Sequence, residues 1–343
     1  MKAIDESIDN TSRRDALQRV GVGIAAVPAL LAAETAAAQG ASPAAAPARP
    51  SGVTDPRELF PKPPFPPQQQ PRPGLASRMT PRPDHGEQSY VGSGRLAGRK
   101  ALVTGGDSGI GRAAAIAYAR EGADVAIGYL PAEEEDARAV IDLIRAAGRK
   151  AVPVPGDIRS EVFCRKMVSD AVAGLGGLDI LVNNAGYQQA RDSILDITTE
   201  QLDATFKTNV YALVWIIQAA LPHLRPGATI INTASINAYD PGEDIIDYAA
   251  TKAAIASLTK SLSKQLTPKG IRVNAIAPGP YWTPLQVSGG QKPEKLPKFG
   301  ADSLTGRPGQ PAEIAPLYVL LASSESSFTS GDIFGSTGGK PQG

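Results

Sequence analysis

The sequence is poor in the residues that build disulfides, metal centres and membrane spans. Its 343 residues include a single cysteine, Cys164, so no intramolecular disulfide can form. The two histidines, His85 and His223, are isolated, and we expect structural or surface roles for them and no metal site. No apolar run approaches the roughly 20 residues that cross a bilayer. These absences argue against a disulfide-stapled domain and an integral membrane protein.

Neither sign of charge is in excess. Lys and Arg number 35 and Asp and Glu number 34, so the net charge of +1 gives no electrostatic reason to expect a nucleic-acid partner. Hydrophobic residues make up 42% of the chain, which is enough for one sizeable core. The composition therefore favours a globular protein with a small-molecule partner.

Residues 1–40 have the pattern of a targeting segment. Paired arginines, Arg13 and Arg14, precede a moderately apolar run over 20–33, and small residues follow at 36–38. This order resembles a twin-arginine signal peptide, and the alternative is a frayed helical tail with two chance arginines. The resemblance implies a periplasmic or otherwise exported protein, or a cytoplasmic one if the signal is not used.

Residues 41–94 form a proline-rich linker and N-terminal arm. The run 63–67 contains four prolines, which can neither continue a helix nor donate ladder hydrogen bonds, so we expect an extended chain. Residues from about 55 onward look less like a random linker, and we expect them to pack on the domain or on a neighbouring subunit. The catalytic domain is then predicted over 95–343.

Short apolar runs alternate with longer stretches of helical period from Gly98 onward. Such alternation predicts a single α/β domain in three layers, a doubly wound parallel sheet with helices on both faces (the Rossmann fold). The predicted strands are 101–103, 125–127, 151–154, 180–182, 229–231, 273–276 and 333–334.

A glycine-rich turn follows the first predicted strand, and an alanine-rich helical segment from Arg112 to Glu121 comes next. Gly105 permits a tight turn, Gly109 lets backbone approach a pyrophosphate, and Gly111 allows close packing of helix on strand. The helix N-terminus offers free N–H groups to phosphates. An ordinary strand-to-helix turn is the alternative interpretation of this stretch taken alone.

The spacing Thr-Gly-x-x-x-Gly-x-Gly resembles the cofactor loop of the short-chain dehydrogenase/reductase family, and further motifs extend the resemblance over Gly98 to Gly339. They include an Asn-Asn-Ala-Gly sequence after the fourth strand and a Pro-Gly loop after the sixth. The resemblance implies a dinucleotide site with these cofactor-binding residues: Thr104, Gly105, Asp107, Ser108, Gly109, Ile110, Gly111, Asp157, Ile158, Asn184, Ala185, Gly186, Tyr248, Lys252, Pro278, Gly279, Tyr281 and Thr283.

The end of the second predicted strand lacks the acid that selects NAD. An Asp or Glu there would bind the 2′-hydroxyl of the adenosine ribose, but the chain has Gly128, Tyr129 and Leu130. A 2′-phosphate would meet no carboxylate from these residues, so NADP is the expected cofactor, with NAD as the alternative. Arg112 is a candidate to reach that phosphate.

Tyr248 and Lys252 are four residues apart in a predicted helix and share one face. A phenol has a pKa near 10, and a nearby ammonium is expected to lower it towards a useful range. Ser235, which follows the fifth strand, can hold a substrate oxygen while Tyr248 moves its proton. Asn209 lies in a helical run where its propensity is poor. These four residues match the family's catalytic tetrad, which implies a proton relay through Asn209.

We therefore expect an NADP-preferring oxidoreductase that transfers a hydride between nicotinamide and a small aldehyde, ketone or secondary alcohol. The alternatives are an NAD-dependent alcohol or sugar dehydrogenase of the same fold and a dinucleotide-binding sensor without turnover. Residues 286–305 are expected to be a mobile substrate lid, with a surface loop as the alternative. The resemblance also implies a homotetramer or homodimer.

Overall fold

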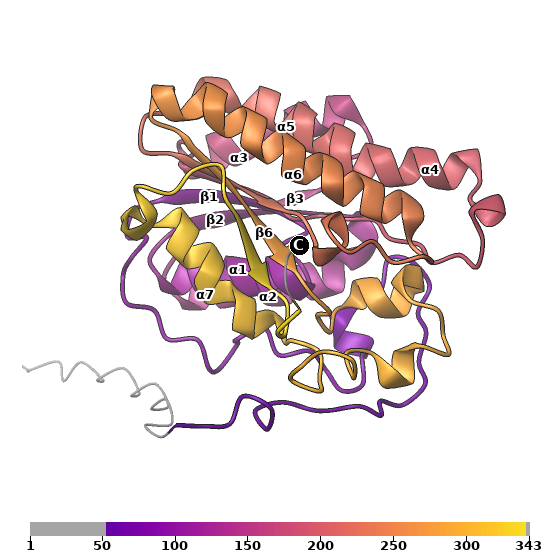
Figure 1. The fold of residues 1–343 in the computed structure, drawn as a ribbon. Coiled ribbons are helices and arrows are strands. Elements are labelled where there is room, and N and C mark those ends of the chain that lie inside the picture. The colour runs from indigo at the N-terminus through magenta and orange to yellow at the C-terminus, as the bar shows by residue number, and fades with distance from the viewer. Residues whose placement is uncertain (1–52, 341–343) are drawn as a thin grey trace, which may run out of the picture. The chain divides into compact units, whose positions relative to one another are not determined.

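The structure, a computed structural model, describes residues 53–340 (Figure 1). The predicted signal peptide and the first residues of the linker lie outside the described residues. The strands are β1 (Lys100–Thr104), β2 (Asp124–Tyr129), β3 (Ala151–Pro155), β4 (Ile180–Asn183), β5 (Thr229–Thr233), β6 (Arg272–Pro278) and β7 (Ile333–Ser336).

The helical segment that the sequence predicts from Arg112 to Glu121 corresponds to α1 (Gly109–Arg120), which begins three residues earlier and ends at Arg120. Ser160 and Thr198 accept hydrogen bonds from the backbone N–H groups of Phe163 and Gln201, and so cap two of the helices. The α-helices are α1 (Gly109–Arg120), α2 (Glu134–Ala146), α3 (Glu161–Leu175), α4 (Thr199–Phe206), α5 (Ala212–Ala220), α6 (Ile246–Leu266) and α7 (Pro311–Ala322).

All seven strands form one parallel sheet in the order β3-β2-β1-β4-β5-β6-β7, which confirms the predicted doubly wound fold. β1 lies between β2 and β4, with Val103 in register with Ile127 on one side and Val182 on the other. The strand order reverses between β1 and β4. In such sheets this switch point opens a crevice at the carboxyl ends of the strands, where ligands bind.

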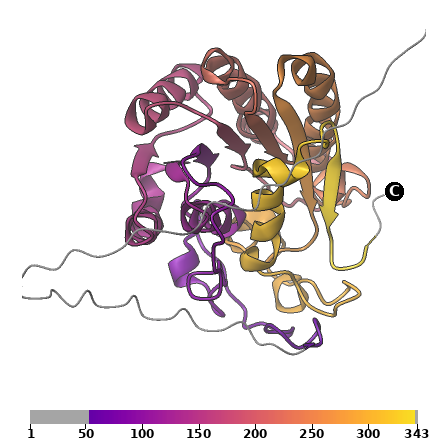
Figure 2. The same cartoon turned by 90° about the vertical axis from the view of Figure 1, so that its left-hand side faces the viewer.

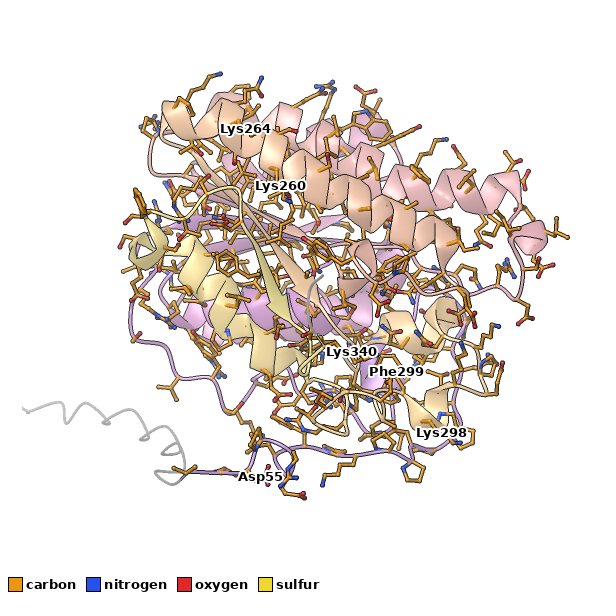
Figure 3. All side chains as sticks on the ribbon, in the orientation of Figure 1. Asp55, Lys260, Lys264, Lys298, Phe299 and Lys340 are labelled. Atoms are coloured by element: carbon orange, nitrogen blue, oxygen red, sulfur yellow. The ribbon has the colours of Figure 1, made fainter. Side chains whose placement is uncertain are left out.

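Helices α1, α2 and α7 cover one face of the sheet, and α3, α5 and α6 cover the other (Figures 1 and 2). Successive strand residues alternate between the two cores: Ala101 and Val103 pack with the first set of helices and Leu102 with the second. Both faces are therefore buried, as a parallel sheet requires. On the outer side of α6, Lys260 and Lys264 face solvent (Figure 3).

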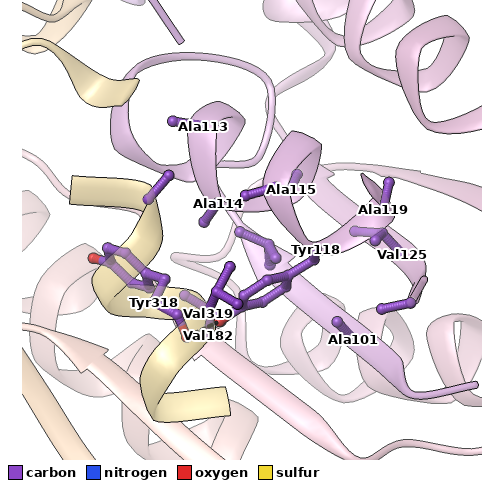
Figure 4. Packing of buried hydrophobic residues seen from close by; sticks show 14 of the residues in the cluster. Ala101, Ala113, Ala114, Ala115, Tyr118, Ala119, Val125, Val182, Tyr318 and Val319 are labelled. Atoms are coloured by element: carbon purple, nitrogen blue, oxygen red, sulfur yellow. Dashed lines mark hydrogen bonds between the residues drawn. The ribbon is translucent and has the colours of Figure 1, made fainter. Parts of the chain in front are cut away.

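Small side chains let α1 lie close to the sheet and to α7. Its alanines at 113, 114, 115, 117 and 119 are at most 2% exposed. Tyr118 fills the space between α1 and α7, where its hydroxyl donates to the carbonyl of Tyr318 over 3.2 Å (Figure 4). This tight packing fixes the position of the α1 N-terminus relative to β1, and so fixes the glycine turn between them.

The described part of the N-terminal arm, residues 53–94, has no strand but packs closely on the domain. Phe65 stacks on the indole of Trp282 with ring centroids 4.3 Å apart, and the Trp282 Nε1–H donates to the carbonyl of Pro81. Further along, the buried Glu121 carboxylate accepts hydrogen bonds from Tyr90 and Arg95. The arm therefore shares an apolar core with residues 286–305, and hydrogen bonds to the Glu121 carboxylate attach it to the C-terminal end of α1.

The expected lid, residues 286–305, lies between the arm and the domain. Val287, Leu296 and Phe299 are buried in one cluster with Phe65 and Trp282. Figure 3 shows Phe299 on the same side of the molecule as Asp55 of the arm. Much of this segment is a packed element and not a bare surface loop. Within residues 53–340, no helix has both the length and the apolar character needed to cross a bilayer.

Phe65→Ala is expected to lower the free energy of unfolding by about 3 kcal/mol, because it removes a buried aromatic ring and leaves a cavity against Trp282. Urea titration followed by circular dichroism measures this change. Val53→Ala, at a fully exposed arm position, is the control and should leave stability unchanged. Equal stabilities for Phe65→Ala and wild type would show that the arm does not contribute to the folded domain.

Candidate active site

A cavity of about 430 Å³ opens at the carboxyl ends of β1, β4, β5 and β6. Of the residues that the sequence marks as functional, the following line it: Gly105, Asp107, Ser108, Gly109, Ile110, Asp157, Ile158, Asn184, Ala185, Gly186, Ser235, Tyr248, Lys252, Pro278, Gly279, Tyr281 and Thr283. Thr104, Gly111 and Asn209 are absent from this wall and lie directly behind it.

In the glycine turn, the backbone at the start of α1 packs directly against the backbone that follows β1. A Cβ on Gly111 would lie 2.0 Å from the carbonyl oxygen of Gly105, so no other residue fits there. Gly109 has φ +52° and lies against Thr283 across the cavity. α1 begins at Gly109, inside this turn, so the N–H groups of its first turn, which have no partner within the helix, lie beside the glycines. This cradle fits the pyrophosphate of a dinucleotide.

Thr104 and Asn184 join the first and fourth strands beneath the cavity. The Thr104 hydroxyl accepts hydrogen bonds from the backbone N–H groups of Asn184 and Ala185, at 2.9 and 3.1 Å. In return the Asn184 side-chain amide donates to the carbonyls of Thr104 and Gly105. These hydrogen bonds hold the ends of β1 and β4 at a fixed separation and so maintain the shape of the crevice.

Ser235, Tyr248 and Lys252 converge on one side of the cavity, where β5 ends and α6 begins. The Lys252 ammonium lies 5.3 Å from the centre of the Tyr248 ring and donates to the carbonyl of Thr233 over 2.7 Å. The Ser235 hydroxyl accepts from the backbone and side-chain N–H groups of Asn237. All three functional side chains are buried and fixed by neighbouring groups.

The pKa of Tyr248 differs from the sequence-based expectation. Burial raises it to about 12, although hydrogen bonding to Ser235 opposes the rise. Burial also lowers the pKa of Lys252 to about 7. The expected lowering of the phenol pKa by an adjacent ammonium is therefore wrong for this structure, because dehydration disfavours the charged forms of both groups. Tyr248 is a neutral phenol, ready to donate a proton.

Asn209 lies in a π-helical turn, Lys207–Tyr211, between α4 and α5. Its side chain accepts from the backbone N–H of Tyr187 at 2.7 Å and donates to the Tyr187 carbonyl at 2.9 Å. A third hydrogen bond reaches the Thr251 hydroxyl. The poor helix propensity of asparagine thus coincides with a local widening of the helix, a feature common at functional sites. Asn209 fixes the loop that follows β4.

Two carboxylates lie at the opposite end of the cavity, beside Gly128 and Tyr129. Asp107 is 1% exposed and its Oδ2 has no hydrogen-bond partner, and Glu133 lies beside it in the same wall. Burial raises the pKa of both carboxyls. Repulsion from Asp136 adds to the rise for Asp107, and repulsion from Asp107 and Asp136 adds to the rise for Glu133. An unpartnered acceptor here fits the hydroxyls of a bound ribose. The sequence reasoning missed Glu133, because it follows the strand end by four residues.

Two arginines could supply a positive charge to a 2′-phosphate at this end of the cavity: Arg112, which the sequence suggested, and Arg159, which lies in the cavity wall. Arg112 does not reach the cavity: it is buried beneath the arm, where its guanidinium pairs with Glu87 at 3.1 Å. Arg159 lines the cavity but is paired with Asp157 at 2.6 Å, so its charge is compensated. Neither arginine offers a free cation to a 2′-phosphate.

The loop after β6 closes the cavity from the side of the lid. Tyr281 is buried and its hydroxyl lies 2.5 Å from that of Ser336 in β7. Other residues that the sequence reasoning missed come from the arm, from the loop after β4, from the two residues just before the lid and from the lid itself. They are Arg72, Pro73, Gly74, Tyr187, Pro284, Leu285, Gln286 and Ser288. No local signal marks the arm residues, because only folding brings them to the cavity.

Comparison with known proteins places the chain among oxidoreductases. The sequence matches the family described as enoyl-(acyl carrier protein) reductase over residues 105–340. An uncharacterized oxidoreductase of Escherichia coli (strain K12), YghA, is 57% identical over 84% of this chain and 99% of that protein. General stress protein 39 of Bacillus subtilis (strain 168) is 49% identical over 78% and 93%. The glucose and ribitol dehydrogenase of Daucus carota is 43% identical over 80% and 96%.

Solved structures give the same result. A short chain dehydrogenase from Burkholderia cenocepacia J2315 in complex with NADP is 36% identical, with a TM-score of 0.66 over 71% of this chain and 98% of that one. A 3-ketoacyl-(acyl-carrier-protein) reductase from Brucella melitensis complexed with NADH is 30% identical, with a TM-score of 0.64 over 71% and 98%. Both the sequence and the fold of the chain are therefore those of the short-chain dehydrogenase/reductase family.

Lys252→Met is expected to remove a pH dependence of stability. Wild type buries an amine with a pKa of about 7, whereas the unfolded chain has a lysine pKa near 10.4. Between these values the unfolded state binds the extra proton, so the free energy of unfolding rises as pH increases from 7 towards 10. Urea titrations of both proteins across this range give the difference. Parallel curves would mean that Lys252 keeps its charge when folded.

Proposed function

Since the chain belongs to the short-chain dehydrogenase/reductase family, we propose that it transfers a hydride between a nicotinamide dinucleotide and a small aldehyde, ketone or secondary alcohol. The observation that carries this proposal is the convergence of Ser235, Tyr248 and Lys252 on one wall of a cavity whose other end is a glycine cradle. A protein that only bound a dinucleotide would not need a buried phenol and amine at this point. A bound nicotinamide would supply or accept the hydride.

The chain's own residues handle the proton. In the direction of carbonyl reduction, Tyr248 donates its phenolic proton to the substrate oxygen, and the Ser235 hydroxyl orients that oxygen. Lys252, with a pKa of about 7, can return a proton to the phenolate at neutral pH. A relay through Asn209 is supported by its place beside Lys252, since both side chains flank Gly186.

We propose NADP as the cofactor. The residues at the end of β2 carry no carboxylate that would repel a 2′-phosphate, and the similar structure from Burkholderia cenocepacia is described as a complex with NADP. The substrate is proposed to be a small carbonyl compound or alcohol, and a sugar or polyol is supported by the similarity to glucose and ribitol dehydrogenase.

NAD is a second candidate, because Asp107 and Glu133 line the adenosine end of the cavity without a free cation beside them. Their carboxylates would accept hydrogen bonds from ribose hydroxyls and repel a 2′-phosphate. The similar Brucella melitensis reductase is described with NADH. Export by the twin-arginine route and assembly as a homodimer or homotetramer stay predictions from the sequence.

Tyr248→Phe should bind the reduced dinucleotide as wild type does but turn over at least about a hundredfold more slowly, because the proton donor is lost while the cavity keeps its shape. Fluorescence titration measures binding, and the absorbance of the nicotinamide measures turnover on a panel of aldehydes and ketones. Unchanged turnover in the variant would remove Tyr248 from the proposed mechanism.

At pH 9, above the pKa of about 8 to which burial raises the Glu133 carboxyl, Glu133→Gln is expected to tighten NADPH binding about five- to tenfold relative to NADH, because it removes one negative charge from the ribose end. Glu134→Gln is the matched control, since Glu134 instead hydrogen-bonds Tyr129 and Arg138. In wild type, lowering the pH should also favour NADPH, as carboxyls with raised pKa become neutral first. An unchanged ratio of the two dissociation constants would exclude Glu133 from cofactor selection.

A further inference from the structure

The N-terminal arm contributes directly to the active-site wall. Arg72, Pro73 and Gly74 line the cavity, although they precede the glycine turn by about 30 residues in sequence. Hydrogen bonds hold this stretch in place at both ends: the Gln70 N–H donates to the carbonyl of Val287 in the lid segment, and the Ala76 N–H donates to the carboxylate of Asp136 in α2. The arm therefore crosses the cavity and is not a separate appendage.

In that wall, Arg72 lies against the loop that follows β4. Its Nη2 donates to the carbonyl of Gln188 at 2.6 Å and to Oε1 of Gln189 at 2.9 Å. The guanidinium stacks on the ring of Tyr187, with Cζ 3.9 Å from the ring centre. Tyr187 directly follows the Asn-Asn-Ala-Gly motif. These contacts use the two hydrogens of Nη2 and fix the plane of the guanidinium.

The charge of Arg72 has no carboxylate partner. No acidic side chain within residues 53–340 forms an ion pair with it. Asp247 attracts the guanidinium only from beyond ion-pair distance, and the positive charge of Arg191 repels it. The Asp247 carboxylate is already occupied by hydrogen bonds from Thr205 and Gln201. Arg159, the other arginine in the cavity wall, is neutralised by Asp157. Arg72 is therefore a half-buried, uncompensated cation in the cavity.

The lid segment is shaped around this guanidinium. Gly289 has φ +102°, and a Cβ placed on it would lie 2.9 Å from Nη2 of Arg72 and 2.8 Å from Oε1 of Gln189. The Gly289 carbonyl accepts a hydrogen bond from Ala190 N–H. Arm, lid and the loop after β4 thus meet at one point, and the absence of a side chain at position 289 leaves room for the arginine there.

We propose that Arg72 binds an acidic group of the substrate, a carboxylate or a phosphate, while the carbonyl lies at Tyr248. This inference rests on the proposed function and names its substrate class. The Nε and Nη1 groups of Arg72 have no protein acceptor in the described chain, and an oxyanion suits such a planar fork. A charge kept partly out of water without a partner is costly, and a substrate anion would offset that cost.

The test compares pairs of aldehydes in which one member carries an acidic group and the other does not. Butanal is paired with 4-oxobutanoate, and glyceraldehyde with glyceraldehyde 3-phosphate; steady-state constants are measured for wild type, Arg72→Gln, Arg72→Lys and Arg165→Gln. Wild type should show a KM at least about tenfold lower for one acidic member of a pair. Arg72→Gln should abolish that preference by raising this KM, with little change in kcat or in the values for the neutral aldehyde.

The other variants separate charge from shape. Arg72→Lys should keep part of the preference, because an ammonium retains the charge but loses the fork. Arg165→Gln removes an exposed arginine that pairs with Glu161 on α3, and it should behave as wild type. If Arg72→Gln does not fold, Gly289→Ala, which displaces the guanidinium, takes its place and should show the same selective rise in KM.

Equal constants for acidic and neutral aldehydes in wild type, or an equal effect of Arg72→Gln on both, would overturn the inference. If no carbonyl compound is turned over by any protein, the proposed function fails separately. Calorimetric binding of 4-oxobutanoate and of inorganic phosphate then decides the role of Arg72. Binding to wild type that is lost in Arg72→Gln supports the role, and equal or absent binding rejects it.

Discussion

The close backbone approach at the turn between β1 and α1 is the constraint on which the rest of the site depends. Gly111 must lack a side chain because its Cβ would strike the carbonyl of Gly105, and Asn184 bridges the same turn from β4. This approach is possible only if α1 lies tightly on the sheet, which its buried alanines allow. Packing in the core thus sets the geometry of the cradle at the switch point of the sheet.

Desolvation decides the charge states of the groups that this geometry brings together. At one end of the cavity, burial keeps the Tyr248 phenol protonated and brings the pKa of Lys252 to about 7, so only the amine titrates near neutral pH. At the adenosine end, burial raises the carboxyl pKa of Asp107 and Glu133. One cavity thus contains a buried phenol and amine and also a buried pair of carboxyls.

The N-terminal arm completes the cavity between these ends. Its aromatic contact with Trp282 and its backbone bonds to Val287 and Asp136 make the arm, the lid segment and α2 one packed unit. The side chains that anchor the arm therefore also place Arg72 against Tyr187, so the stability of the arm and the substrate contact proposed for Arg72 depend on the same packing. A change in the arm would alter the cavity wall around Arg72 without touching Ser235, Tyr248 or Lys252.

The sequence by itself determined the seven strands, the glycine turn and the shared helix face of Tyr248 and Lys252, because each depends on neighbours within a few residues. Only the tertiary structure decided the rest. Arg112 pairs with Glu87 under the arm instead of reaching the cavity, whereas Glu133 and Arg72 reach it from separate segments. The upward pKa shift of Tyr248 likewise depends on burial, which is a property of the packed chain and not of its local sequence.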